Sequence, residues 1–357
     1  MATSTAVEYA NTLASLEGNE FQAEVSTYFG TQIIGFQTVP DKPQGDGGLD
    51  GFSHNGERGY CCYGLEHDVF KTAKERVDAI VVKFSKDLRR LFELGFDGKK
   101  LVKVDNSVLK TILPKDRKLE HIYLIVNWFE DHRILGRIGT AVQTYKAASE
   151  CRYVASSVTV VVIGPTELSA LYSVTESAVY RVQQRVFVQK VKQTAKTVVI
   201  GNPADFEAKM QILREIRPDM LPTIEQWSAH LLENWRMALA FEIELDKTLN
   251  MLHQSLEDCR RRIAVRVAEL ALSSTEQWKE LGKAHELALE ILGRDFGEHG
   301  PLLSDVSSGE IARLVGECPI NWTKPVNQYC PAKISEGHPN PLKISVITHG
   351  RSENDLN

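Results

Sequence analysis

The sequence predicts an α/β domain over residues 1–175, an all-α region over residues 176–298 and an irregular tail over residues 299–357. In the first part, short apolar runs of strand length alternate with helical apolar periodicity, which is typical of a mixed central sheet with helices on both faces. In the second part, apolar residues recur at steps of three and four. Beyond residue 299 prolines cluster and the end is polar, which indicates a docking segment with a frayed end.

The composition is that of an ordinary globular protein, with 357 residues, 43% hydrophobic and 25% charged, and a formal net charge of -5. That total charge favours neither a nucleic acid nor a membrane as partner, so any such surface must be local. The six cysteines lack CxxC spacing, which predicts free thiols in a reducing compartment. No signal-peptide pattern and no apolar run of about 18 residues is found, so we expect a cytoplasmic protein without membrane contact.

The first helix is predicted over about residues 7–29, where Phe21, Val25 and Tyr28 lie at helical spacing. Glu24 lies on the same apolar face, which is unusual for a carboxylate. Two interpretations stand: a half-buried glutamate that is paired with a cation, or a glutamate that serves a site. A short strand is then expected over Gln32–Thr38.

A glycine-rich loop and a hairpin follow, over Gln44–Glu66. The dipeptide Asn55-Gly56 predicts a type I′ turn, because both of its central residues need positive φ. With that turn, Asp50 lies opposite Cys61 on the neighbouring strand. Because opposed residues project on one face of a sheet, the sequence predicts a surface shared by Asp50, Cys61 and Tyr63.

Next, a long helix is predicted from an N-cap at Asp68 to about Leu94, with an apolar stripe on one face and many basic residues on the other. A second basic stretch runs from Lys99 to Lys118, with seven basic residues against two acids. These stretches are either solvated faces or a surface for a phosphate backbone. Two buried strands, His121–Val126 and Val158–Ile163, complete the predicted α/β domain.

The helical region carries the longest periodicity in the chain, from Ile224 to Leu270, interrupted at Glu242. This apolar seam fits an internal bundle and an intermolecular interface equally well. Thr197–Ile200 is a candidate last strand, and Ser307–Val315 is the one helical piece expected in the tail.

Sequence motifs exclude several common chemistries, since there is no GxxxxGK[ST], HExxH or GxSxG motif. What remains is an aspartate on a hairpin strand, a helical glutamate before it and basic stretches after it. Phosphodiester hydrolysis needs that combination, because carboxylates hold Mg²⁺ and cations hold the phosphate.

The order of these residues resembles the PD-(D/E)xK restriction-endonuclease-like nucleases, in which a helical Glu precedes a strand Asp and the next strand carries (D/E/Q)-x-K. The phrase GDGGLDG with its hairpin is similar to the nuclease domains of bacterial antiphage systems of the CBASS and Lamassu types. In this chain the (D/E/Q) and Lys positions are occupied by Cys61 and Tyr63. The resemblance covers about the first 175 residues and implies a restriction-endonuclease-like fold.

The resemblance implies a site for Mg²⁺ or Mn²⁺ held by Asp50 and Glu24, with Glu66 as the candidate third ligand and Lys83 or Lys71 as the catalytic cation. It also implies an effector subunit that an SMC-like ATPase and a small helical subunit restrain, that cuts double-stranded DNA with little sequence preference when released, and that can assemble into a homo-oligomer. The expected DNA-binding residues on the basic faces are Lys74, Lys86, Lys99, Lys100 and Lys103. The alternative is a catalytically degenerate subunit that binds DNA or scaffolds the complex.

Overall fold

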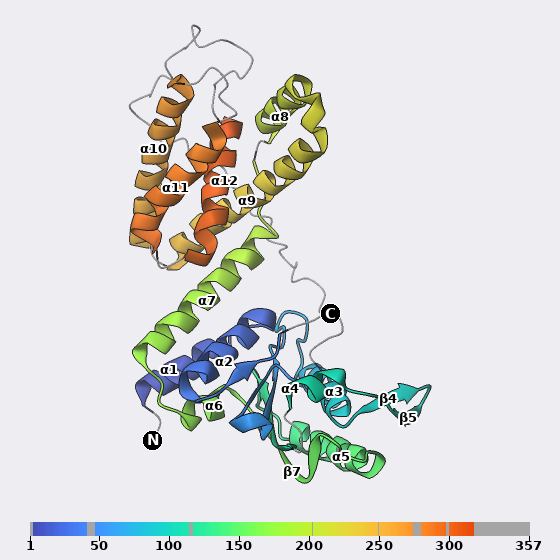
Figure 1. Cartoon of the computed structure of the whole chain (residues 1–357). Helices are drawn as coiled ribbons and strands as arrows, with labels where there is room; N and C mark the ends of the chain where they lie inside the picture. Colours follow the sequence, from blue (N-terminus) through green and yellow to red (C-terminus); the bar gives the residue numbers. More distant parts are fainter. Residues whose placement is uncertain are drawn as a thin grey trace, which may run out of the picture. The chain divides into compact units, whose positions relative to one another are not determined.

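A computed structural model of the chain describes residues 3–40, 47–113, 117–201, 203–248, 250–273, 280–297 and 300–317 (Figure 1). The chain divides into two compact units, Met1–Val186 and Phe187–Asn357. Within the described residues, no helix combines the length and the apolar character that crossing a membrane requires.

The first unit is built around a mixed five-stranded sheet in the order β1-β2-β3-β6-β7. β1 to β3 are antiparallel neighbours, whereas β3, β6 and β7 run parallel. The α/β class expected for the N-terminal part is therefore confirmed. Its elements are α1 (Ser4–Leu13), α2 (Gly18–Gln32), β1 (Gln37–Thr38), β2 (Gly51–Ser53), β3 (Arg58–Tyr63), α3 (Ala73–Leu91), β4 (Leu94–Asp97), β5 (Lys100–Lys103), α4 (Ser107–Ile112), β6 (Leu119–Val126), α5 (Arg133–Ala148), β7 (Val154–Ile163) and α6 (Pro165–Leu171).

Helices cover both faces of this sheet. On one face, α3 and α5 bury Phe84 and Ile134 against strand residues such as Leu124. On the other face, α1 and α2 bury Phe21 and Tyr28 in a separate core that includes Ile125. Ile125 follows Leu124 directly in β6, so the alternation of side chains along the strand supplies both cores.

The predicted hairpin forms with the expected register, in which Gly51 pairs with Tyr60 and Ser53 with Arg58. At its turn, Asn55 has φ 53° and Gly56 has φ 88°, and the amide of Glu57 donates to the carbonyl of His54 over 3.2 Å. Both central residues thus have the positive φ that an Asn-Gly turn requires.

Several boundaries differ from the expectation. The helix predicted over residues 7–29 is two helices, α1 and α2, and β1 is shorter than the expected strand. α3 begins at Ala73 and not after Asp68, because Thr72 and Glu75 form a capping box. The hairpin β4–β5 was not expected at all. Its strands carry exposed charged residues and lie outside the main sheet, so they lack the apolar pattern that predicts a strand.

The second unit is helical over its described residues. Its helices are α7 (Glu176–Ala195), which begins in the first unit, α8 (Ala204–Ile216), α9 (Leu221–Thr248), α10 (Asn250–Ser273), α11 (Leu281–Phe296) and α12 (Gly300–Glu317). The seam residues Trp235, Leu245 and Ile263 are buried in one core with α11 and α12. Of the two interpretations of the seam, the internal bundle accounts for these contacts.

Two expectations for this unit are corrected, the first wholly and the second in part. Thr197–Ile200 forms no strand; it is irregular chain that contributes Val198 and Ile200 to the core. Residues 300–317, the first part of the expected tail, form helix α12, which confirms the helical piece predicted over Ser307–Val315 and extends it at both ends. Gly309 permits a close approach to α9, since an added Cβ would lie 2.1 Å from the carbonyl oxygen of Asn234. The remainder of the expected tail, residues 318–357, lies outside the described residues.

Candidate functional site

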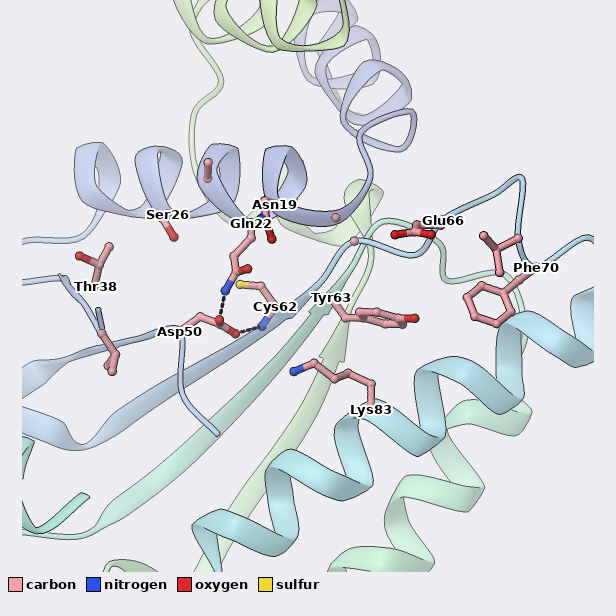
Figure 2. Close-up of a pocket in the computed structure, with 15 residues that line it drawn as sticks. Asn19, Gln22, Ser26, Thr38, Asp50, Cys62, Tyr63, Glu66, Phe70 and Lys83 are labelled. Carbon is pink, nitrogen blue, oxygen red and sulfur yellow. Dashed lines mark hydrogen bonds between the residues drawn. The ribbon is translucent and has the colours of Figure 1, made fainter. Parts of the chain in front are cut away.

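Asp50 lies where the chain enters β2, and its backbone joins both neighbouring segments. Its amide donates to the carbonyl of Tyr60 over 2.8 Å, and its carbonyl accepts from the amide of Val39 over 3.0 Å. Asp50 as a whole is only 8% exposed. Its Oδ2 accepts from the amide of Cys62 over 2.6 Å, and its Oδ1 accepts from Nε2 of Gln22 (Figure 2). Asp50 is therefore held rigidly by β3 and α2.

The glycine-rich entry has a steric reason at Gly48. Its φ is +93°, and a Cβ there would lie 2.7 Å from the carbonyl oxygen of Asp87 in α3. The loop thus passes directly against α3, which only glycine allows in this conformation. The thiol of Cys61 donates to the Gly48 carbonyl over 3.0 Å and holds the loop to β3. Asp46, the other aspartate of this loop, lies outside the described residues.

Lys83 reaches the same place from α3. Figure 2 shows its ammonium directed toward Asp50 and Cys62. Its Nζ lies 2.5 Å from Oδ2 of Asp87, one helical turn further along. Burial lowers the pKa of Lys83, but the charge and hydrogen bond of Asp87, and then the charge of Asp50, outweigh it, so that the pKa lies above its ordinary value. The site therefore contains an ammonium that is charged near neutral pH, beside the carboxylates of Asp87 and Asp50.

A cavity of about 680 Å³ opens on these groups. It is lined by Asp50, Lys83, Gln22, Tyr63 and Glu66, among others. Burial, followed by the negative charge of Glu66, raises the pKa of Tyr63, while Lys83 opposes the rise. Glu66 is exposed at the far side of Tyr63 in Figure 2. The structure thus places Asp50, Glu66 and Lys83 around one cavity.

Glu24 is not part of this cavity, contrary to the expectation that it holds a metal with Asp50. It is fully buried, and its carboxylate pairs with Arg181 at 2.9 Å and with Arg185 at 3.0 Å, both from α7. It also accepts a hydrogen bond from the hydroxyl of Tyr9 over 3.2 Å. The paired-glutamate interpretation is therefore the one that the contacts support, and the position on α2 that faces Asp50 belongs to Gln22.

Lys71 does not line the cavity either. It precedes α3 on the exposed surface, and its backbone amide donates to Glu75 over 3.0 Å. The expected DNA-binding lysines are all exposed and divide into two places. Lys74 and Lys86 lie on α3, whereas Lys99, Lys100 and Lys103 lie on the β4–β5 hairpin. Lys74 pairs with Asp78 at 3.0 Å, and Lys103 pairs with Glu150.

The surface predicted for Asp50, Cys61 and Tyr63 exists only in part. Cys61 does lie opposite Asp50, but its side chain is buried in the core beneath α3. Tyr63 lines the cavity together with Cys62, and the carboxylate of Asp50 is bound by the amide of Cys62. Burial, followed by the nearby carboxylates, raises the pKa of the thiols of Cys61 and Cys62, so neither thiol is suited to nucleophilic attack or to binding a hard cation.

Sequence reasoning missed two residues of the site, Gln22 and Asp87. Gln22 lies two residues before Glu24, and therefore on a different face of α2. Asp87 follows Lys83 by four residues, a spacing that places opposite charges together on a helix and was available as a signal. Neither residue belongs to the pattern that drew attention to Asp50.

The cavity contains the kinds of ligand that a small, hard cation takes, and Tyr63 lies between its two carboxylates, Asp50 and Glu66, in Figure 2. Mg²⁺ is commonly held by one or two carboxylates, with water and substrate phosphate completing its shell. Asp50 and Glu66 supply carboxylates, and the amide of Gln22 supplies an oxygen when it turns over. Among the described residues, the one group of three His, Cys, Asp or Glu side chains close enough to share a cation lies elsewhere, at Glu242, His253 and Glu257.

Comparison with known proteins adds no further constraint on this chain. No protein-family model, no curated protein and no solved structure matches it.

Proposed function

We propose that this chain is a metal-dependent DNA endonuclease, the effector subunit of a cytoplasmic antiphage or antiplasmid defence complex. One observation carries the proposal: Asp50, from the hairpin, and the ammonium of Lys83, from α3, meet at one cavity that also contains Glu66. The order of strands and helices around Asp50 supports the resemblance to restriction-endonuclease-like nucleases. The SMC-like and helical partners of the proposal rest on that resemblance alone.

In this proposal each residue of the cavity has one task. Asp50 and Glu66 bind Mg²⁺, which when bound polarises the phosphate and acidifies the attacking water. Lys83 stabilises the negative charge that develops on the phosphate oxygens, because its raised pKa keeps it protonated throughout the physiological range. In this chain Tyr63 occupies the position where (D/E/Q)-x-K nucleases have a lysine, and Lys83 supplies the ammonium instead. Asp87 positions the ammonium of Lys83, and Gln22 orients Asp50.

A second function is favoured by the hydrogen bonds of Asp50. Both of its carboxylate oxygens accept from groups of the chain itself, Oδ1 from Gln22 and Oδ2 from the amide of Cys62. A carboxylate so satisfied fits a degenerate site that has become structural. In that case the chain binds DNA or scaffolds its complex without cutting.

Plasmid cleavage in Mg²⁺ or Mn²⁺ separates the two functions. For the nuclease, Asp50→Ala and Lys83→Met each lower the cleavage rate at least about 100-fold. Glu120→Gln, an exposed carboxylate at the start of β6, and Lys146→Met, a half-buried lysine that donates to the carbonyl of Val158, serve as matched controls and keep the wild-type rate.

Metal binding supplies a second measurement that does not depend on release by partners. For the nuclease, Mn²⁺ binds the isolated chain in an Asp50-dependent manner, which electron paramagnetic resonance detects. If the wild-type chain does not cut DNA, and if the Asp50→Ala variant binds Mn²⁺ as well as the wild type does, the nuclease proposal is contradicted and the scaffold function is supported.

A further inference from the structure

The helical unit contains a second group of polar residues that the proposed nuclease does not use. Glu242 of α9 and His253 and Glu257 of α10 each offer one ligand atom, and these atoms lie within 4.8 Å of one another. His253 and Glu257 are four residues apart on one helix, so they share a face. Glu242 faces them from the preceding helix. Two carboxylates and one imidazole thus converge from two helices of the same unit.

His253 is the residue that points to a ligand. Its Nδ1 is buried, and it has no hydrogen-bond partner among the described residues. A buried polar atom without a partner costs about 1–3 kcal/mol, so such atoms are rare unless something absent from the chain satisfies them. The imidazole of His253 offers a nitrogen within 4.8 Å of an oxygen of each carboxylate, and a metal cation held by these three atoms is a partner that the chain itself does not supply.

The charges around the group also leave room for a cation. Arg260, which is 6% exposed, pairs with Glu242 at 2.8 Å, with Glu257 at 2.6 Å and with Glu310 at 2.9 Å. Arg313 also pairs with Glu310. Glu242 and Glu310 are 15% and 1% exposed, and the two guanidiniums balance their charge, whereas Glu257 is 41% exposed. The third carboxylate of the group therefore reaches the surface, where a cation from solution has access to it.

Arg260 does not block the group. A carboxylate has two oxygens, so Glu242 and Glu257 can each keep one on the guanidinium and offer the other to a metal. Ligand carboxylates in metal sites are usually oriented by such outer hydrogen bonds. Arg260 therefore positions the carboxylates of Glu242 and Glu257.

We propose that Glu242, His253 and Glu257 form a zinc-binding site that joins α9 to α10. Imidazole favours zinc and its neighbours in the first transition row over Mg²⁺, and two carboxylates with one imidazole form a set of three ligands that leaves one position for water. The ion cross-links the last turns of α9 to the first turns of α10, so it stabilises the helical unit. This site is independent of the Asp50 cavity and of the nuclease proposal.

Zinc binding by the full chain tests the site. Asp50→Ala is used as the background, so that the cavity of the first unit does not contribute. The protein is stripped with a chelator, and Zn²⁺ is titrated against a chromophoric chelator, with the bound metal counted by mass spectrometry. We expect His253→Gln and Glu257→Gln each to weaken the affinity for one equivalent of Zn²⁺ at least about 100-fold. His285→Gln, on α11, is the matched control and keeps the affinity of the background protein.

A second measurement shows where the zinc acts. Zn²⁺ raises the midpoint of thermal unfolding in the Asp50→Ala protein and in His285→Gln, but not in His253→Gln or Glu257→Gln. Far-UV circular dichroism establishes whether both ligand variants fold. If His253→Gln does not fold, Glu257→Gln still tests the site, because glutamine has nearly the same shape as glutamate. Equal zinc affinity in all variants, or no zinc bound more tightly than about 10 μM by any of them, overturns the proposal.

Discussion

Arg181 and Glu24 lie 157 residues apart in the chain and form an ion pair, with 2.9 Å between Nη2 and Oε1. Arg185, one helical turn further along α7, binds the other oxygen of the same carboxylate at 3.0 Å. Glu24 is fully buried, whereas the two arginines remain 30% and 27% exposed. This relationship explains why a carboxylate interrupts the apolar face of α2: it joins α7 to the helix that delivers Gln22 to Asp50.

Glu24→Gln therefore tests a structural role against a catalytic one. Removing the carboxylate leaves two guanidiniums facing a buried neutral amide, so the free energy of unfolding falls by about 3 kcal/mol, the low end for a broken buried pair because both arginines are partly exposed. Urea denaturation measures the loss. The half-buried Glu20, which pairs with Arg185 at 3.4 Å, is the control, and Glu20→Gln costs no more than about 1 kcal/mol.

The same variant distinguishes the two roles in cleavage. Folded Glu24→Gln protein keeps the cleavage rate that depends on Asp50, because Glu24 does not reach the cavity. If folded Glu24→Gln lost Asp50-dependent Mn²⁺ binding as well as activity, the ion pair would not be its main function.

The pair of Lys83 and Asp87 predicts a difference between two neighbouring variants. Lys83→Met removes the ammonium and lowers the cleavage rate at least about 100-fold at every pH. Asp87→Asn keeps the ammonium but removes the charge that most raises its pKa, so burial then lowers the pKa of Lys83. We expect about a tenfold loss at neutral pH and an alkaline limb of the pH–rate profile that moves to lower pH.

An unchanged alkaline limb in Asp87→Asn would mean that Asp87 does not control the protonation of Lys83. Lys146→Met is the control for the loss of a half-buried lysine on the same face of the sheet, and it leaves the profile in place.

The buried thiols predict how stability changes in alkaline solution. In the unfolded chain Cys61 and Cys62 ionise around their ordinary pKa of 9.0, while burial raises the pKa of both in the folded chain. The folded protein therefore keeps protons that the unfolded chain releases. The free energy of unfolding is unaffected by these thiols below about pH 9 and falls above it, by at most about 1.4 kcal/mol per pH unit for each thiol, until the folded pKa is passed.

Urea denaturation between about pH 8 and pH 10 measures this slope. Cys61→Ala and Cys62→Ala each make it less steep. Leu65→Ala, which removes buried apolar atoms but no titrating group, lowers stability at every pH and leaves the slope unchanged. Equal slopes in all four proteins would show that the thiols do not change their pKa on folding.

The β4–β5 hairpin carries the next prediction, because Lys99 and Lys100 are exposed at its end and Phe96 beside them is 57% exposed. In Figure 1 the hairpin projects from the rest of the first unit. The double variant Lys99→Ala/Lys100→Ala weakens binding to duplex DNA about tenfold, and it reduces the slope of log K against log salt by roughly 0.9 for each lost phosphate contact. Fluorescence anisotropy at several salt concentrations measures both.

A matched loss of two charges, Lys190→Ala in α7 together with Lys196→Ala directly after that helix, leaves the salt slope unchanged. Equal losses in both double variants would place the effect in the net charge of the chain and not in the hairpin.

A comparison of Gly48 with Gly98, a glycine of the β4–β5 turn, tests how closely the glycine-rich loop must pass α3. Both have positive φ, but a Cβ at Gly48 would lie 2.7 Å from a backbone oxygen, whereas Gly98 has nothing within 4 Å. Gly98→Ala therefore costs only the left-handed strain, about 1 kcal/mol, and Gly48→Ala costs clearly more, about 3 kcal/mol. Equal losses in urea denaturation would mean that the loop can move away from Asp87.

Residue patterns along the chain were enough for the alternation of strands and helices, for the hairpin register and for the position of Asp50 at the start of a strand. Each of these depends on neighbours in sequence: apolar spacing selects the element, and the φ preference of Asn55-Gly56 selects the register. Lys83 was one of two candidates on the following helix, and periodicity could not choose between Lys83 and Lys71. The choice depends on where α3 begins and on which of its faces packs against β3.

The sequence by itself determined the α/β class of the first unit, the hairpin that presents Asp50 and the helical character of most of the second unit, because local sterics and apolar period decide these. Tertiary structure alone decided the partners of the polar groups that meet across different elements. It gave Glu24 to Arg181 and Arg185, brought Gln22 and Lys83 to Asp50, and placed Glu242 against His253 and Glu257. Such pairs join residues far apart in the chain, and the free energy of burying a charge chooses among them only when the surrounding side chains are in place.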